Sequence, residues 1–146
     1  EGMIDVSATH WRMLENGWTF EDGPGVVPDP LNHARYMHEV YAAADAKYTG
    51  RVTVPVLWDK ETKRIVNNES SEIIRMFNSA FDGVGAKAGD FYPVELREEI
   101  DAINKRVYET VNNGVYRCGF ATTQAAYDEA VTALFDTLDW LEEKLK

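Results

Sequence analysis

The segment between residues 52 and 74 constrains the fold more than any other part of the chain, because it holds a strand, a hairpin and a helix start in close succession. Residues 52–58 (V-T-V-P-V-L-W) are β-branched or apolar and predict a buried strand. Pro55 interrupts this strand and cannot donate to a sheet ladder, so it predicts an edge, a bulge or a cis peptide bond. Residues 59–63 are typical of a turn, and residues 64–67 predict a second strand. The two strands would form a hairpin.

A helix is predicted directly after this hairpin. Asn68 can cap it, and Glu69 and Ser70 fill its first turn. A helix N-terminus has unpaired N–H groups and about half a positive charge, so Ser70 lies where a ligand carboxylate could bind, and Glu69 could bind an ammonium group. Together they predict a site for the amino-acid end of a ligand. The alternative is ordinary strand-edge chemistry at Pro55 and ordinary helix-start chemistry at Glu69 and Ser70.

The composition is that of a soluble globular protein and disfavours several partners. The net charge of −10, from 15 basic and 25 acidic residues, argues against nucleic acid or an anionic membrane surface as the main partner. No apolar run reaches the roughly 18 residues that a membrane span needs. The single cysteine, Cys118, excludes an internal disulfide and suits a reducing compartment, so a cytoplasmic location is expected.

The rest of the N-terminal part predicts further elements and then a linker. Residues 3–8 alternate apolar with polar or small residues and predict a short strand. Residues 21–30 are rich in glycine and proline and predict a loop, and residues 32–44 predict a helix. Residues 82–92 contain three glycines and predict a linker between two domains.

Helical periodicity dominates after the linker. Pro93 stands at the start of a predicted helix, which the sequence Asn-Asn-Gly at 112–114 should end, because glycine accepts the left-handed conformation there. Residues 115–121 would form a connector, and Thr122 or Thr123 would cap the last helix, which should pack antiparallel to the first. Each of these two predicted helices has a wide apolar stripe, and no third helix follows to cover them. The chain also does not begin with methionine, so a piece of a longer protein is expected.

Reactive side chains outside the opening segment give weaker signals. His10, His33 and His38 lack the Cys or carboxylate spacing of a zinc site, so no metal is predicted. Cys118 does not lie in the first turn of a helix after a strand, where a thiolate is best stabilised, so catalysis by it is disfavoured. Tyr116 follows a predicted helix end and is expected to be half-buried. Alternatively its phenol could donate a proton if its pKa of about 10 were lowered.

Several motifs resemble those of glutathione transferases. The order of strand, helix, Val-Pro strand, hairpin strand, Glu-Ser helix, linker and helices is similar to theirs. The resemblance to the Xi class, the glutathionyl-hydroquinone reductases, covers essentially the whole chain. Four stretches carry it: G-W-T-F-E-D (17–22), R-V-T-V-P-V-L-W-D (51–59), N-N-E-S-S-E-I-I-R-M (67–76) and N-N-G-V-Y-R-C-G-F-A-T-T-Q (112–124).

The resemblance implies an α/β thioredoxin-like N-terminal domain and an all-α C-terminal domain. The N-terminal domain would span residues 1–81 without its first strand and helix, and residues 93–146 would begin the helical domain. Glutathione would be the substrate, and no metal would be needed. The residues implied at the site are Trp18 lining it, Arg51, Val52, Thr53 and Val54 contacting the peptide through their backbone, Pro55 in cis, Glu69 and Ser70 holding the γ-glutamyl ammonium and carboxylate, and Tyr116 exchanging a proton beside the quinone. Trp18 has core or loop packing as its alternative role.

The implied activity is the glutathione-dependent reduction of glutathionyl-hydroquinones by a homodimer. The family's nucleophilic cysteine belongs to a C-P-W-A motif, which does not occur in these 146 residues. The chemistry is therefore expected from a cysteine outside this stretch, and the stretch by itself is expected to be inactive and marginally stable. Two alternatives stay open: a non-catalytic binding module related to glutathione transferases, and a conjugating transferase.

Overall fold

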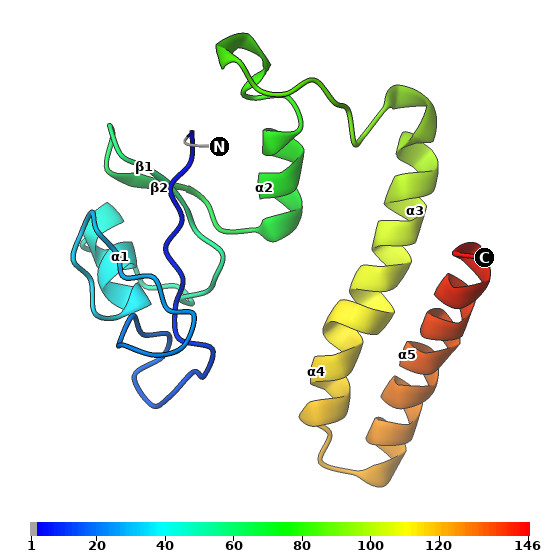
Figure 1. The fold of residues 1–146 in the computed structure, drawn as a ribbon. Coiled ribbons are helices and arrows are strands. Elements are labelled where there is room, and N and C mark those ends of the chain that lie inside the picture. Colours follow the sequence, from blue (N-terminus) through cyan, green and yellow to red (C-terminus); the bar gives the residue numbers. More distant parts are fainter. Residues whose placement is uncertain (1–2) are drawn as a thin grey trace. The chain divides into compact units, whose positions relative to one another are not determined.

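The computed structural model describes residues 3–146 and divides the chain into two compact units, Glu1–Lys87 and Ala88–Lys146. The first unit contains a hairpin and short helices, and the second consists of long helices (Figure 1). Within the part described here, no helix is long and apolar enough to cross a membrane.

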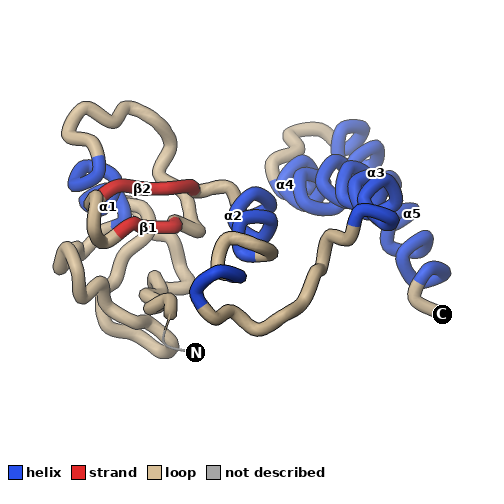
Figure 2. The backbone as a smooth tube through the Cα atoms, turned by 90° about the horizontal axis from the view of Figure 1, so that it is seen from above, coloured by secondary structure: helices blue, strands red, loops and turns tan. Residues whose placement is uncertain are grey.

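The hairpin of the first unit consists of β1 (Leu57–Asp59) and β2 (Arg64–Asn67), which pair antiparallel with Trp58 opposite Ile65. The two strands lie side by side, and long loops surround them (Figure 2). In the turn, the Thr62 hydroxyl donates to Asp59 at 2.6 Å and, with two backbone N–H groups, lowers the pKa of that carboxyl. The predicted hairpin is confirmed.

The predicted strand over residues 52–58 is wrong in its extent, because β1 begins only at Leu57. The Val54–Pro55 peptide bond is cis. Residues 51–56 belong to neither strand of the hairpin, and Pro55 itself has no N–H to donate to a ladder.

The helix predicted from residue 32 begins five residues later, as α1 (Met37–Ala44). The Glu39 carboxylate explains the late start, because it accepts the N–H groups of Tyr36 at 2.9 Å and of Arg35 at 2.6 Å. These two bonds, the one from Tyr36 being the stronger, lower the pKa of Glu39. The preceding residues form a turn in which the Asp29 carboxylate accepts the N–H of Leu31 at 3.0 Å.

The predicted strand over residues 3–8 does not form. Of residues 3–8 only Ala8 makes a bridge, with Val27, through N···O distances of 2.9 and 3.0 Å. The rest of the segment is held by side chains: Ser7 donates to the Pro28 carbonyl at 3.1 Å, and Lys60 forms an ion pair with Asp5. Alternating polarity predicts which side chains could face a core, but a strand also needs a neighbour to complete its ladder.

The first unit is organised around a small core between α1 and the hairpin. Phe20, Met37, Val40 and Tyr41 form its buried cluster. Tyr41 is the most buried of them, with 2% of its surface exposed. Partly buried residues pack against this cluster from the loops and strands: Trp18, Ala34, Val52, Val56, Trp58 and Ile65. After the hairpin, α2 (Ser70–Phe77) and a short 3₁₀ turn, η1 (Asp82–Val84), complete the unit.

The second unit contains one nearly continuous helical run and one long helix. The run consists of the 3₁₀ turn η2 (Val94–Leu96), α3 (Arg97–Val107), the π-helical segment η3 (Tyr108–Asn112) and α4 (Asn113–Gly119). Helix α5 (Gln124–Lys144) returns antiparallel beside it, as predicted (Figure 1). The Thr123 hydroxyl caps α5 by accepting the Ala126 N–H at 3.3 Å, which confirms one of the two predicted caps.

The predicted helix end at Asn112-Asn113-Gly114 is wrong, and so is the connector predicted for residues 115–121. Gly114 is buried inside the helical run and does not have the left-handed backbone of a C-terminal cap. A Cβ built on Gly114 would lie 3.8 Å from the Leu134 Cβ, which is an ordinary van der Waals distance, so the residue faces α5 and still has room for a methyl group. Gly114 therefore lies in the interior of the helical run and does not terminate a helix.

Polar side chains join α3 to α5. Thr137 is only 1% exposed, and its hydroxyl accepts from Arg106 Nε at 3.1 Å and lies 2.9 Å from the Thr110 hydroxyl. The Arg106 guanidinium also lies over the Trp140 ring, 4.2 Å from its centroid. Apolar periodicity in both helices predicts an apolar interface between them, but at this point the interface contains a buried polar network.

Candidate functional site

The start of α2 presents a carboxylate and unused helix-start donors next to each other. Glu69, and not Asn68, is the N-cap: its Oε1 accepts from the Ser71 N–H at 3.3 Å and from the Ser71 hydroxyl at 3.1 Å. Glu69 and Ser70 are both exposed. Throughout residues 3–146 nothing hydrogen-bonds to Glu69 Oε2, or to the amide and hydroxyl of Ser70. An ammonium and a carboxylate of one ligand could therefore bind here together.

Asn68 does not cap α2 as predicted; its side chain bonds to Tyr41 of α1 instead. Its side-chain amide donates to the Tyr41 hydroxyl at 3.0 Å and to Thr53 Oγ1 at 3.3 Å. The Tyr41 hydroxyl also donates to the Thr53 carbonyl at 3.0 Å and accepts the Thr53 N–H at 3.3 Å. These bonds bring together two predicted parts of the site, the segment before Pro55 and the start of α2.

The same bonds decide which backbone groups of residues 51–54 remain free. The Arg51 carbonyl accepts the Tyr48 hydroxyl at 2.6 Å, and both backbone groups of Thr53 are used by Tyr41. The backbone N–H and C=O groups of Val52 and Val54 make no hydrogen bond with any described residue. Val54 is also 38% exposed, so it offers a free strand-like edge to an extended peptide.

A surface cavity adjoins the start of α2. Its lining comes from α1, β2 and the residues that follow each of them, and includes Tyr41, Tyr48, Arg64, Asn68 and Glu69. Of the predicted site residues only Glu69 lies in this lining. The cavity therefore adjoins the predicted site at Glu69 and continues from there toward Tyr41 and Tyr48.

Two predicted site residues, Trp18 and Tyr116, take no part in these hydrogen bonds. Trp18 packs, partly buried, against the core cluster of the first unit, and its carbonyl accepts the Met37 N–H at 2.9 Å. Tyr116 belongs to the second unit and lies within α4, not past a helix end. It is 65% exposed, not half-buried as expected. Its ring is nearly parallel to that of Phe120, at a centroid distance of 6.4 Å.

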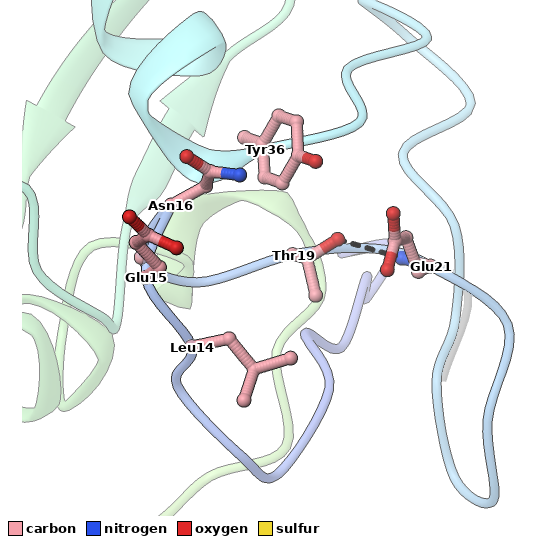
Figure 3. Close-up of a pocket in the computed structure, with 7 residues that line it drawn as sticks. Leu14, Glu15, Asn16, Thr19, Glu21 and Tyr36 are labelled. Carbon is pink, nitrogen blue, oxygen red and sulfur yellow. Dashed lines mark hydrogen bonds between the residues drawn. The ribbon is translucent and has the colours of Figure 1, made fainter.

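A second hollow of the first unit contains none of the predicted site residues. Leu14, Asn16, Thr19 and Tyr36 line it together with two glutamates, and the Glu21 N–H donates to the Thr19 hydroxyl at 3.0 Å (Figure 3). Glu21 forms an ion pair with Arg35, which raises the pKa of that guanidinium. Of the two glutamates in this lining, Glu21 thus already has a charged partner.

The remaining reactive side chains form no cluster. Cys118 is a free, partly buried cysteine on α4. His10 stacks on Trp11 and His38 on Tyr36, at centroid distances of 4.9 and 5.3 Å. Residues 3–146 contain no group of three or more His, Cys, Asp or Glu side chains that could hold a metal ion.

Comparison with known proteins identifies the family. The pattern of the glutathione S-transferase N-terminal domain matches residues 7–80, which include β1, β2 and the start of α2. The chain belongs to the glutathione transferase family. It is 68% identical over 145 residues to glutathionyl-hydroquinone reductase PcpF of Sphingobium chlorophenolicum, a match that covers 99% of this chain and 46% of PcpF.

Solved structures of glutathione transferases have the same fold. The glutathione-bound structure of YqjG from Escherichia coli is 57% identical, with a TM-score of 0.90, over 94% of this chain and 45% of that one. The glutathione transferase Xi of Phanerochaete chrysosporium is 51% identical, with a TM-score of 0.91, over 97% of this chain and 49% of that one. The chain thus spans about half the length of these relatives. The predicted fold class, a thioredoxin-like α/β part followed by an all-α part, is confirmed.

The sequence gives little sign of Tyr41 and Asn68, the residues that connect the two halves of the candidate site. The spacing of Tyr41 within residues 32–44 is that of an apolar helix face, which predicts core packing only. Its hydroxyl was the unused signal, since a tyrosine in a core usually has a polar partner. The position of that partner, Thr53, could not be read from the sequence.

Proposed function

We propose that this chain carries the glutathione-recognition part of an enzyme that reduces glutathionyl-hydroquinones to hydroquinones. The observation that carries the proposal is the pairing of two unsatisfied features. The start of α2 offers Glu69 Oε2 and the Ser70 amide, and the extended segment before Pro55 offers the backbone of Val54. They lie on residues directly adjacent to Asn68 and Thr53, which contact each other at 3.3 Å.

Each feature suits one part of glutathione. The γ-glutamyl end carries an ammonium and a carboxylate, which would bind to Glu69 and to the start of α2. The cysteinyl unit has an amide N–H and C=O, which would pair with Val54 in the manner of an added strand. Trp18 and the remaining backbone groups of residues 51–55 complete the proposed site.

The names of the relatives support the type of reaction. PcpF is a glutathionyl-hydroquinone reductase, and YqjG has been solved with glutathione bound. In the proposed reaction, a cysteine thiolate outside residues 1–146 attacks the sulfur of a glutathionyl-hydroquinone. The bond between this sulfur and the ring carbon breaks, and the carbon keeps the electron pair and takes a proton to give the hydroquinone. A second glutathione thiolate then attacks the mixed disulfide, which releases glutathione disulfide and restores the cysteine.

Tyr116 is the proposed proton donor or acceptor in this reaction. It is the exposed phenol of α4, and its neighbouring ring is the exposed Phe120. A cytoplasmic location and a homodimer belong to the same proposal, and the single cysteine fits a reducing compartment.

The test uses the full-length protein and the variant Glu69→Gln. This variant keeps an oxygen that can cap α2 but removes the charge that would pair with the γ-glutamyl ammonium. Loss of one charged hydrogen bond should raise the Kd for glutathione by about 10-fold or more in calorimetric titration. Glu72→Gln is the matched control, since it removes a charge from the same turn, where Asn67 holds that carboxylate at 2.5 Å. It should change the Kd by less than about threefold.

Turnover of 2-glutathionyl-hydroquinone, with chromatography of the hydroquinone formed, tests the reaction itself. Binding of glutathione without turnover would support a binding module instead. Formation of conjugates from glutathione and an electrophile, without any reductase activity, would support a conjugating transferase. Equal Kd values for the two glutamine variants would refute the role of Glu69.

A further inference from the structure

The Tyr41 hydroxyl is fully used although it lies in an apolar core. A phenolic oxygen has one hydrogen to donate and two lone pairs to accept with. Tyr41 donates to the Thr53 carbonyl at 3.0 Å and accepts from the Thr53 N–H at 3.3 Å and from Asn68 Nδ2 at 3.0 Å. All three positions are therefore occupied, and only 2% of the residue is exposed.

The partners of this hydroxyl, Thr53 and Asn68, both lie next to residues of the proposed glutathione site. Thr53 directly precedes Val54, and Asn68 directly precedes Glu69, the two residues at which the proposed glutathione contacts begin. Asn68 Nδ2 closes the arrangement by reaching Thr53 Oγ1 at 3.3 Å. One hydroxyl thus links the two segments that are proposed to bind the γ-glutamyl end and the cysteinyl unit of the same peptide.

Tyr41 is also anchored well enough to act as a fixed point. Its ring belongs to the buried cluster with Phe20, Met37 and Val40 on the inner side of α1. The Tyr48 ring packs against it at a centroid distance of 4.8 Å, and the Tyr48 hydroxyl holds the Arg51 carbonyl at 2.6 Å. Movement of the segment before Pro55 would break hydrogen bonds to both tyrosines.

We propose that the Tyr41 hydroxyl is a positioning group that holds the segment before Pro55 and the start of α2 at the spacing required by glutathione. This inference rests on the proposed function, because it concerns the same site. Tyr41 itself does not touch the peptide; it acts through Thr53 and Asn68. A core that needed only apolar packing at this position would be filled equally well by phenylalanine, since the hydroxyl gains its hydrogen bonds solely from these two segments.

The test compares Tyr41→Phe with wild type in the full-length protein. Loss of the hydroxyl should raise the Kd for glutathione by about three- to tenfold, because the two segments then have to be ordered by the ligand. The kcat at saturating glutathione should stay within about twofold of wild type, since bound glutathione restores the geometry and no reacting atom is touched. Asn68→Ala should have the same effect, and the double variant should bind no more weakly than about twofold below the weaker single variant.

Thr137→Val is the matched control, because it removes a buried hydroxyl from the helical unit and should lower the thermal midpoint without changing the Kd for glutathione. If Tyr41→Phe and Asn68→Ala lower the thermal midpoint but bind glutathione like wild type, Tyr41 is only structural and the inference is wrong. If wild-type protein itself binds no glutathione, the proposed function fails and this inference fails with it. The two failures are distinguished by the wild-type titration.

Discussion

Replacement of Gly114 by alanine decides between two roles for this residue, because they predict opposite signs. If Asn112-Asn113-Gly114 ended a helix, Gly114 would have left-handed backbone, and alanine would cost about 1–2 kcal/mol. In the structure the residue lies in α4, without the positive φ that Gly85 has at 91°. In a right-handed helix, alanine is favoured over glycine by about 0.5–1 kcal/mol.

The packing around Gly114 does not reverse this sign. The new methyl group would lie 3.8 Å from the Leu134 Cβ, an ordinary van der Waals distance. Gly114→Ala should therefore stabilise α4 locally by about 0.5–1 kcal/mol. A larger side chain would have no such room, and Gly114→Leu should separate α4 from α5 and destabilise both.

Native-state hydrogen exchange in the full-length protein is the suitable assay, because it reports on α4 separately from the rest of the chain. Amides of residues 113–119 should exchange about two- to fivefold more slowly in Gly114→Ala than in wild type. Gly85→Ala is the control of opposite sign, since φ there is 91° and alanine would be strained. Faster exchange of the α4 amides in Gly114→Ala would refute the assignment of Gly114 to the helix interior.

Two further predictions concern polar contacts that hold elements in place. Thr137→Val should lower the free energy of unfolding by about 1–2 kcal/mol in urea titration, because Arg106 Nε loses its acceptor at 3.1 Å; an unchanged midpoint would contradict this. Glu39→Gln should destabilise the start of α1 at pH 7, and this loss should shrink as the pH falls below the ordinary carboxyl pKa of 4.5. The sign follows because the folded pKa of Glu39 is lowered, so its contribution is present above 4.5 and lost as the carboxylate is protonated; thermal midpoints at pH 7 and 3 measure it.

The hairpin and the helix after it were predictable because their signals are local. A polar turn between two short runs leaves few alternatives, so the hairpin formed as predicted, with β2 over the predicted residues and β1 shorter than predicted. The cap of α5 was equally local, since the Thr123 hydroxyl reaches an amide three residues later. The glutathione transferase resemblance rested on such local motifs, and the family comparison bears it out.

The errors arose where a residue type has two uses. Glycine often ends a helix in the left-handed conformation, but it can also lie inside one, and Gly114 has no positive φ and lies within α4. The alternating pattern of residues 3–8 is necessary for a strand but does not supply the neighbour that a ladder requires. The apolar periodicity predicts a helix from residue 32, but α1 begins at Met37. The Glu39 carboxylate, which lies within α1, accepts the Tyr36 N–H and so fixes the start of the helix there.

The sequence by itself therefore determined the hairpin and the helix after it, the family and the two short segments that are proposed to contact glutathione. Only the tertiary structure decided which atoms of those segments remain free. The backbone N–H and C=O of Thr53 both hydrogen-bond to the Tyr41 hydroxyl, whereas those of the next residue, Val54, bond to no described residue. The physical reason is that a hydrogen bond depends on the distance between atoms that lie far apart along the chain. Tyr41 and Asn68 are 27 residues apart in sequence, yet they meet at 3.0 Å.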